Sequence, residues 1–312
     1  MKILFKKDLI QNLNYESMLK TQEEGFIKHS QGELTQPPVG LLKFDSGSLH
    51  IKYAHLKGDP FCVIKLVTSF SGIGKDKKGK TDGCYMVFSS ETGELTHSLF
   101  DEGYLTNLRT VLAPSVILKR VFKSPPQKIG ILGNGIIAKE QAKILDKCFG
   151  IKKYFFAGRR KEALLELKNE LEKEGLEIET CLYSEETYKA LADECSFIIT
   201  TTSAREPVLK SASYFKRNAI VALGSDEPGK RELSQSFLDQ ADLLVCDSKQ
   251  QSFEDGEFEF LKEKQKKSVF ELDQILEKKE KDLEAFPLKV FDLTGMGVQD
   301  VQIAKNLAII QT

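Results

Sequence analysis

The stretch that decides the fold of this chain runs from residue 128 to residue 160 and reads KIGILGNGIIAKEQAKILDKCFGIKKYFFAGRR. Its first five residues form a short apolar run before a glycine, which predicts a buried parallel strand. The next six residues fit the pattern G-x-G-x-x-G/A, and apolar residues at helical spacing follow them. In this pattern the first glycine allows a tight turn, the second lets the backbone approach a pyrophosphate, and the small third residue lets the helix pack on the strand. The N-terminus of such a helix attracts anions.

A second strand is predicted over Tyr154–Ala157, at the distance expected for a dinucleotide-binding βαβ unit. A glycine turn in some other α/β unit is the alternative that we consider weaker. The predicted cofactor contacts of the loop are Gly133, Asn134, Gly135, Ile136, Ile137 and Ala138.

The choice between NAD and NADP depends on the end of this second strand. NAD-specific sites carry an Asp or Glu there to bind the ribose hydroxyls. Here the strand is followed by Gly158, Arg159 and Arg160, and the first carboxylate after it is Glu162. Guanidinium groups attract a 2′-phosphate and can bind it through two hydrogen bonds. The alternative is that both arginines open the next helix into solvent. Because cations oppose the dipole at a helix N-terminus, we favour NADP over NAD.

Length and composition exclude several classes of protein. The chain has 312 residues, enough for two domains, and its net charge of -1 provides no basic field for nucleic acid. No apolar run approaches the length of a membrane span, and the start MKILFKKDLI lacks the apolar core of a signal peptide. The six Cys contain no C-x-x-C pair and the four His form no cluster. We expect reduced thiols, no metal site and a cytoplasmic location.

Two domains of different kind are predicted. Before residue 124, strand-like runs follow one another without crossover helices, which indicates a mainly antiparallel sheet with some helix. The segment Ser124-Pro125-Pro126 is the best linker, and strands and helices alternate after it. The predicted fold class is therefore α/β, with a doubly wound Rossmann domain over residues 124–297. A substrate-binding and dimerisation domain of the α+β type would comprise residues 1–123, joined by a C-terminal helix at 298–312.

Segments spread over most of the chain resemble the ornithine cyclodeaminase/mu-crystallin family. They are VIKLVTSF, SSETGELTHSLFDEGYLTNLRT, ILGNGIIA, TTTSAREPVL, VALGSDEPGKREL, ADLLVCDSKQQSFEDGE and LTGMGVQDVQIA. The resemblance implies a cofactor domain, a second domain built from the N-terminal part and the C-terminal helix, and homodimers formed through the antiparallel sheets. It also implies action on α-amino or α-imino acids with NAD or NADP.

The resemblance assigns roles to three charged residues that the sequence alone leaves open. Lys65 lies in an otherwise apolar strand, where it either reaches solvent or faces a cavity; the resemblance makes it a catalytic and substrate-binding residue. Arg109, near the start of a helix, is implied as a ligand of the substrate carboxylate rather than a surface ion pair. Asp226 follows a predicted strand, at the edge where parallel sheets hold their active sites. It is implied as a proton relay, and a turn Asp is its alternative role.

Weaker assignments complete the predicted site. Thr106 is predicted as a helix N-cap and as a cofactor contact, and Tyr53 as a substrate contact. Hydroxyl groups after another predicted strand are expected on the nicotinamide side of the cofactor: Thr201, Thr202 and Ser203.

Two departures from the family pattern concern the substrate. The expected Arg after a proline is missing from Pro37-Pro38-Val39-Gly40, and an expected Met-Pro pair reads Tyr53-Ala54. The leading interpretation is a dimeric NADP-dependent oxidoreductase of an α-imino or α-amino acid, such as a ketimine reductase or amino-acid dehydrogenase. One alternative is a cyclodeaminase that recycles its hydride. Another is a mu-crystallin-like protein that binds NADP and a small ligand with little turnover, which the missing Arg favours.

Overall fold

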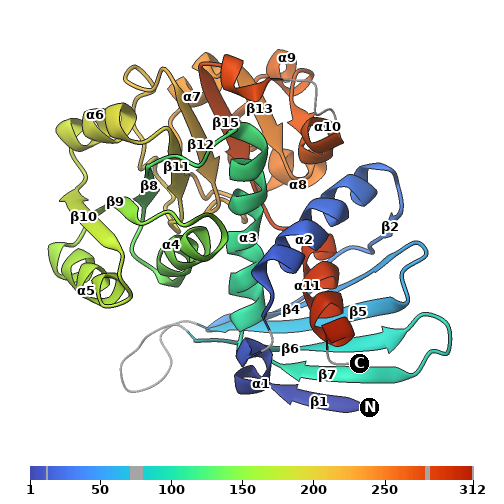
Figure 1. The fold of residues 1–312 in the computed structure, drawn as a ribbon. Coiled ribbons are helices and arrows are strands. Elements are labelled where there is room, and N and C mark those ends of the chain that lie inside the picture. The colour runs from blue at the N-terminus through green and yellow to red at the C-terminus, as the bar shows by residue number, and fades with distance from the viewer. Residues whose placement is uncertain (12, 71–79, 278–281, 311–312) are drawn as a thin grey trace. The chain divides into compact units, whose positions relative to one another are not determined.

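The computed structural model describes residues 1–11, 13–70, 80–277 and 282–310 (Figure 1). The chain forms two compact units, Met1–Arg109 with Met296–Thr312, and Thr110–Gly295. The chain first crosses from one unit to the other within helix α3 (Tyr104–Val121), between Arg109 and Thr110. This point precedes the linker predicted at Ser124-Pro125-Pro126. From Thr110 onward this helix packs within the second unit, where the side-chain amide of Gln141 donates to the Val111 carbonyl at 3.1 Å. Residues 311–312, the end of the predicted C-terminal helix, lie outside the described residues.

The first unit is built on a seven-stranded sheet in its described part, in the order β1-β7-β6-β5-β4-β2 with β3 also paired to β4. All neighbouring pairs are antiparallel except β1–β7, which is parallel. The strands are β1 (Lys2–Phe5), β2 (Leu34–Thr35), β3 (Gly40–Phe44), β4 (Gly47–Leu56), β5 (Phe61–Phe70), β6 (Lys80–Ser89) and β7 (Leu95–Phe100). The mainly antiparallel sheet predicted from the sequence is confirmed.

Helices cover one face of this sheet, which is why the two faces differ in exposure. The helices of the unit are α1 (Lys6–Gln11), α2 (Tyr15–Ser30) and α11 (Gly297–Ile310). Figure 1 shows α2 and α11 side by side over strands β4 to β7. Asn14 caps α2 by accepting a hydrogen bond from the Ser17 amide at 3.0 Å. On the covered face, Leu56, Val63 and Leu99 are almost fully buried.

The second unit is a doubly wound sheet of eight described strands, in the order β10-β9-β8-β11-β12-β15-β13-β14 with every neighbouring pair parallel. The order reverses at β8, as in Rossmann folds. The strands are β8 (Lys128–Leu132), β9 (Lys153–Gly158), β10 (Glu177–Leu182), β11 (Phe197–Thr200), β12 (Asn218–Ala222), β13 (Leu243–Cys246), β14 (Phe270–Glu271) and β15 (Leu288–Asp292). The predicted α/β fold class is confirmed.

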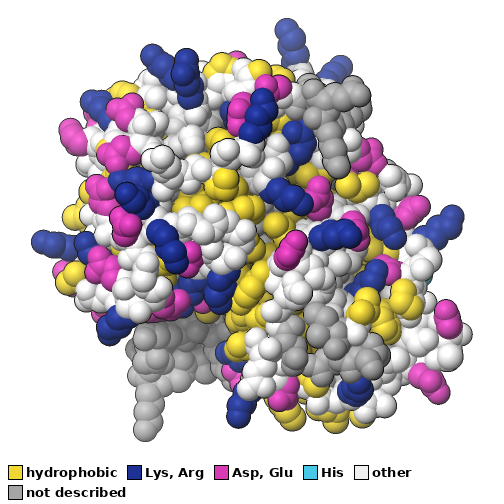
Figure 2. Space-filling view, viewed as in Figure 1, with side chains coloured by type: hydrophobic (Ala, Val, Ile, Leu, Met, Phe, Trp, Pro, Cys, Tyr) yellow, Lys and Arg dark blue, Asp and Glu magenta, His cyan; other side chains and the backbone are white. Residues whose placement is uncertain are grey.

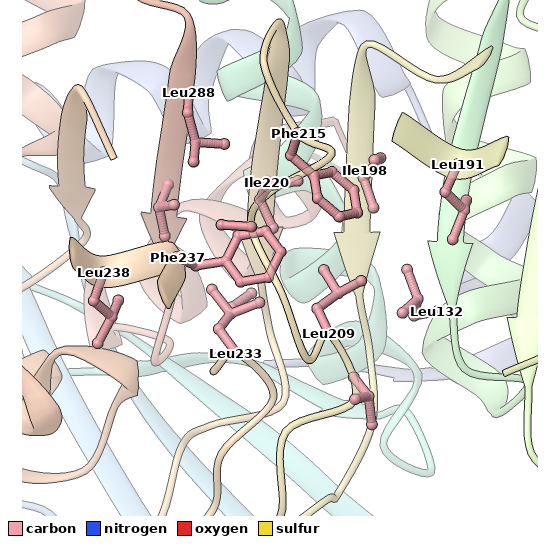
Figure 3. Packing of buried hydrophobic residues seen from close by; sticks show 14 of the residues in the cluster. Leu132, Leu191, Ile198, Leu209, Phe215, Ile220, Leu233, Phe237, Leu238 and Leu288 are labelled. Atoms are coloured by element: carbon pink, nitrogen blue, oxygen red, sulfur yellow. The ribbon is translucent and has the colours of Figure 1, made fainter. Parts of the chain in front are cut away.

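Helices and a large apolar core complete this unit. The helices besides α3 are α4 (Ile136–Phe149), α5 (Lys161–Glu172), α6 (Glu185–Glu194), α7 (Gln235–Gln240), α8 (Lys249–Glu254), α9 (Glu263–Lys266) and α10 (Leu272–Glu277), with 3-10 turns at Glu257–Phe260 and Leu283–Ala285. Figure 3 shows part of the core, where Phe215 and Phe237 pack together among leucines and isoleucines from strands, helices and the segments between them. No helix of the described residues combines the length and the apolar character needed to cross a membrane.

Several elements were not anticipated from the sequence, among them strand β1, helix α1, strand β2 and strand β14. The two-residue strands leave no periodic pattern to detect. Strand β1 exists because it pairs with the distant β7. The prediction of Thr106 as an N-cap is wrong, because α3 begins at Tyr104 and the carboxylate of Asp101 accepts from the Leu105 amide at 2.7 Å.

Candidate functional site

The glycine loop forms a cradle between β8 and α4. Gly133 has a φ of 120°, and a Cβ there would collide with the Thr201 hydroxyl. Its amide donates to the Ala157 carbonyl at 2.9 Å, which fixes the turn against β9. Gly135 is the N-cap of α4, has no side-chain cap and faces open space. The first amides of α4 are therefore directed at a region that a pyrophosphate can occupy.

A pocket of about 910 Å³ lies in front of this cradle, a size suited to a small-molecule ligand. The structure brings most of the predicted cofactor residues into its wall: Gly133, Asn134, Gly135, Gly158, Arg159, Arg160, Thr201, Thr202 and Ser203. Ile136, Ile137 and Ala138 belong to the first turn of α4 and do not line the pocket. Ala138 is fully buried, as expected of the residue that lets helix and strand pack closely.

The charges on the pocket wall favour an anionic ligand. Arg159 and Arg160 are exposed there, and Arg205 and Lys210 are two further cations that the sequence had not singled out. Two carboxylates, Glu185 and Glu206, also line the pocket. Glu185 forms an ion pair with Lys189 at 3.1 Å and accepts a hydrogen bond from the Tyr214 hydroxyl. Elsewhere on the molecule, Figure 2 shows Lys and Arg mixed with Asp and Glu over the visible face.

A buried carboxylate that the sequence analysis missed, Glu232, ties the ends of two strands together at this pocket. Its Oε1 accepts from the Thr202 amide at 2.6 Å and the Thr202 hydroxyl at 2.8 Å. Its Oε2 accepts from the Thr200 hydroxyl at 2.6 Å and the Gly224 amide at 2.8 Å. Burial raises the pKa of Glu232, and these donors oppose that shift. Glu232 thus holds the loop after β11 beside the loop after β12, which leads to Asp226.

Asp226 lies in the loop that follows β12, at the carboxyl edge of the parallel sheet, as the sequence predicted. Its side chain is 48% exposed, and its Oδ1 accepts from the Lys230 ammonium at 2.7 Å. Lys230 also lies 3.7 Å from the Glu227 carboxylate. Asp226 is thus a solvent-accessible carboxylate that is paired with the lysine four residues further along the loop.

The first unit contains a buried cluster of opposite charges around Asp300, a residue of the first turn of α11. Lys65 Nζ donates to both carboxylate oxygens of Asp300, at 2.9 and 3.0 Å, and the two side chains are 2% and 4% exposed. Arg109 Nε lies 3.4 Å from Asp300 Oδ1 but makes no hydrogen bond to a described residue. The Tyr85 hydroxyl donates to Asp300 at 3.2 Å and also contacts the Thr106 hydroxyl at 3.3 Å. The cluster therefore combines two buried cations with one carboxylate.

The pKa values of this cluster reflect incomplete compensation of its charges. Burial lowers the pKa of Lys65 to about 8, with Asp300 raising it and Arg109 and Lys52 lowering it. Burial alone would raise the pKa of Asp300, but the charges of Lys65, Arg109 and Lys52 bring it below its ordinary value. A further anion would stabilise both cations.

Of the remaining predicted site residues, Tyr53 lies apart from the Asp300 cluster and Thr106 lies outside the pocket wall. Tyr53 is 39% exposed and pairs with Ile64, whereas its neighbour Lys52 pairs with Lys65. Because side chains alternate along a strand, Tyr53 faces the opposite side of the sheet from Lys65 and does not join the Asp300 cluster. Thr106 belongs to the first unit and is not part of the pocket wall. Among the described residues, no group of His, Cys, Asp and Glu is arranged to hold a metal ion.

Comparison with known proteins identifies the family of this chain. Residues 2–308 match the model of the ornithine cyclodeaminase/mu-crystallin family. The chain belongs to that family. It is 27% identical to the alanine dehydrogenase of Archaeoglobus fulgidus, covering 97% of this chain and 92% of the relative. It is 28% identical to the Delta(1)-pyrroline-2-carboxylate reductase of Bacillus thuringiensis, covering 90% and 88%. A solved archaeal alanine dehydrogenase dimer with bound NAD superimposes with a TM-score of 0.85 at 26% identity, covering 99% and 95%.

Proposed function

We propose that this family member is a nicotinamide-dependent oxidoreductase that acts on an α-imino or α-amino acid. The observation that carries the proposal is the buried pairing of Lys65 and Arg109 around the single carboxylate of Asp300. Two desolvated cations with one counter-ion suit one substrate carboxylate. The dinucleotide cradle of the second unit and the activities named for the relatives support the same conclusion.

In the proposed reaction, the glycine cradle and the pocket wall would hold a reduced nicotinamide cofactor, which would supply a hydride when bound. The α-carbon of the imine would accept this hydride and the imine nitrogen a proton, to give the α-amino acid and the oxidised cofactor. Asp226 would deliver the proton in reduction and take it back in oxidation. Lys65 and Arg109 would bind the α-carboxylate and so orient the α-carbon. Asp300 would keep Lys65 charged in its buried position.

For the cofactor we propose NADP rather than NAD. The end of β9 presents Arg159 and Arg160 to the pocket, where an NAD-specific site would present a carboxylate. The amides at the start of α4 would hold the pyrophosphate, and the two guanidinium groups would bind the 2′-phosphate. Thr201, Thr202 and Ser203 are proposed to lie along the nicotinamide part, and Glu232 fixes their loop.

We also propose a homodimer formed through the uncovered face of the first sheet. This face exposes large apolar side chains from several strands: Ile3, Phe5, Leu42, Phe44, Tyr53 and Phe100. Two stacked pairs, Phe5–Phe100 and Phe44–Phe70, lie on it. An exposed apolar face of this extent is typical of a protein–protein interface.

The proposal is tested by following NADPH oxidation with a panel of cyclic imines, and with 2-oxo acids in the presence of ammonia. Turnover is expected with at least one imino acid and is expected to fall at least about tenfold in Lys65→Met. Ornithine supplied with oxidised cofactor tests for a cyclodeaminase, which would release ammonia without net NADPH formation. Tight NADPH binding with no turnover on any of these compounds would refute the oxidoreductase and leave a binding protein.

A further inference from the structure

The loops that follow β11 and β12 are packed against each other around the side chain of Glu232. A Cβ on Gly224 would lie 1.8 Å from the Thr202 carbonyl oxygen and 2.6 Å from the carboxyl carbon of Glu232, so only glycine allows this approach. Glu232 is fully buried, and its own amide donates a hydrogen bond to the carboxylate of Glu257. The Glu232 carboxylate is therefore a fixed group directly behind the pocket wall.

The donors around Glu232 determine the direction of each hydrogen bond. An ionised carboxylate donates nothing and offers about four lone-pair sites. Its Oε1 accepts from the amide and the hydroxyl of Thr202, and its Oε2 accepts from the Gly224 amide and the Thr200 hydroxyl. Because these donors fill the lone-pair sites, a proton on either oxygen would displace one of them. They favour the ionised form of Glu232, and in that form both threonine hydroxyls must donate to it.

The two threonine hydroxyls on the pocket side of this wall can therefore act only as acceptors toward a ligand. The Thr202 hydroxyl uses its one proton in the bond to Glu232 and accepts from the Ala204 amide at 3.4 Å, which leaves one lone pair. The Thr201 hydroxyl donates to the Leu132 carbonyl at 3.0 Å. Both threonines line the pocket and are half-buried. A ligand group that meets these hydroxyls must donate the hydrogen bond.

The strand order indicates which part of a dinucleotide would meet Thr202. Strands β9 and β11 flank β8 on opposite sides, so Arg159 and Arg160 lie on one side of the glycine cradle and Thr202 lies on the other. With the pyrophosphate at the cradle and the 2′-phosphate on the arginines, the nicotinamide would extend to the side of β11. Its carboxamide carries an NH2 donor, whereas the carboxylate of a nicotinate ring can only accept.

We propose that Glu232 is a positioning residue: it turns the Thr202 hydroxyl so that this oxygen accepts a hydrogen bond from the carboxamide NH2 of the nicotinamide. The negative charge of Glu232 would also disfavour an anionic substituent at the same place on the ring. The inference rests on the proposed function and adds how the pocket recognises the reacting end of its cofactor. A site built to pair with an NH group rejects analogues that lack it, because its own polar group is then left unpaired.

The test measures, by calorimetric titration, the Kd of oxidised dinucleotides that differ only in one ring substituent. They are NADP, its acetylpyridine analogue, which is uncharged at that substituent but lacks the NH2, and its nicotinic acid analogue, which carries a carboxylate there. The wild type should bind NADP at least about tenfold more tightly than the acetylpyridine analogue, which corresponds to about 1.4 kcal/mol. The nicotinic acid analogue should bind more weakly still.

Variants separate the hydrogen bond from the charge. In Thr202→Val, NADP and the acetylpyridine analogue should bind within about threefold of each other, and the nicotinic acid analogue should stay the weakest because Glu232 keeps its charge. Thr202→Ser should restore the preference for NADP. Glu232→Gln should narrow the gap between NADP and the nicotinic acid analogue. Thr21→Val is the matched control, because it removes a hydroxyl that donates to the Met18 carbonyl in the other unit, and it should behave as wild type.

The outcomes separate the two levels of the proposal. Equal binding of all the analogues by the wild type, or a preference for NADP that survives in Thr202→Val, would overturn the roles of Glu232 and Thr202 and leave the oxidoreductase intact. Binding of no member of this series, nor of the matching NAD series, would refute the proposed function itself. Thermal unfolding checks each variant. If Glu232→Gln fails to fold, the wild type and the Thr202 variants still decide the question, because a wild type without preference contradicts the proposal.

Discussion

Asp300 on helix α11 binds Lys65 on strand β5 through both of its carboxylate oxygens, across 235 positions of sequence. Both side chains are nearly inaccessible to solvent. A buried ion pair of this kind is sensitive to the loss of one partner, because the remaining charge is left uncompensated.

The first prediction concerns this pair. Asp300→Asn should lower the free energy of unfolding by about 3–5 kcal/mol, since Lys65 and Arg109 would stay buried without a counter-ion. The double variant Asp300→Asn/Lys65→Met should recover part of that loss. Urea unfolding of the two single variants and the double variant gives the coupling energy. Additive effects would show that the two residues do not depend on each other.

The second prediction concerns cofactor choice. Fluorescence titration of the wild type should give tighter binding of NADPH than of NADH. In Arg159→Ala/Arg160→Ala, affinity for NADPH should fall at least about tenfold while that for NADH changes little. Lys161→Ala, an exposed lysine at the start of α5, is the control that removes a nearby charge from outside the pocket wall. Tighter NADH binding by the wild type would refute the assignment.

Asp226 carries the third prediction. If it relays the proton, Asp226→Asn should reduce turnover by roughly a hundredfold or more, with NADPH binding retained. Glu227→Gln is the matched control, because Glu227 is the adjacent exposed carboxylate and also lies near Lys230. Equal effects of the two substitutions would remove Asp226 from the mechanism and indicate a shared electrostatic effect on Lys230.

The fourth prediction tests the uncovered sheet face. Light scattering should show a dimer of the wild type at micromolar concentration and a monomer for Leu42→Lys/Phe44→Lys, because two cations would be buried in the interface. Leu165→Lys, which replaces a similarly exposed leucine on α5, should remain dimeric. A monomeric wild type would rule out this interface.

The fifth prediction is a dependence of stability on pH. Burial raises the pKa of Asp292 to about 8, and the pKa values of Glu257, Glu232 and Asp247 are raised in the same direction. The folded protein therefore holds a proton on Asp292 that the unfolded chain releases near pH 4, so this stabilisation is lost as the pH rises through about 8. The Tm should fall by roughly 5 °C or more between pH 5 and pH 8. Asp292→Asn should flatten this dependence, and the exposed Asp193→Asn should not.

Local sequence was sufficient for the Rossmann unit. The βαβ unit has a recognisable local pattern: an apolar run of five residues, a glycine in the turn and a small residue where the helix meets the strand, all at fixed spacing. The position of Arg159 and Arg160 just after a strand can also be predicted from the residues around them. For the same reason Asn14 and Ser184 could be anticipated near helix starts, since capping is a contact within one turn.

The sequence by itself thus determined the two kinds of sheet, the glycine cradle and the cations at the end of β9, and a family resemblance predicted roles for Lys65, Arg109 and Asp226. Only the tertiary structure decided which groups meet. Strand register placed Lys52 rather than Tyr53 on the face of Lys65, because a shift of one residue reverses the direction of a side chain. Packing of α11 on the sheet brought Asp300 to Lys65, and the convergence of β11 and β12 brought Glu232 to Thr202. Such contacts join residues far apart in the chain, so they cannot be predicted from a local sequence pattern.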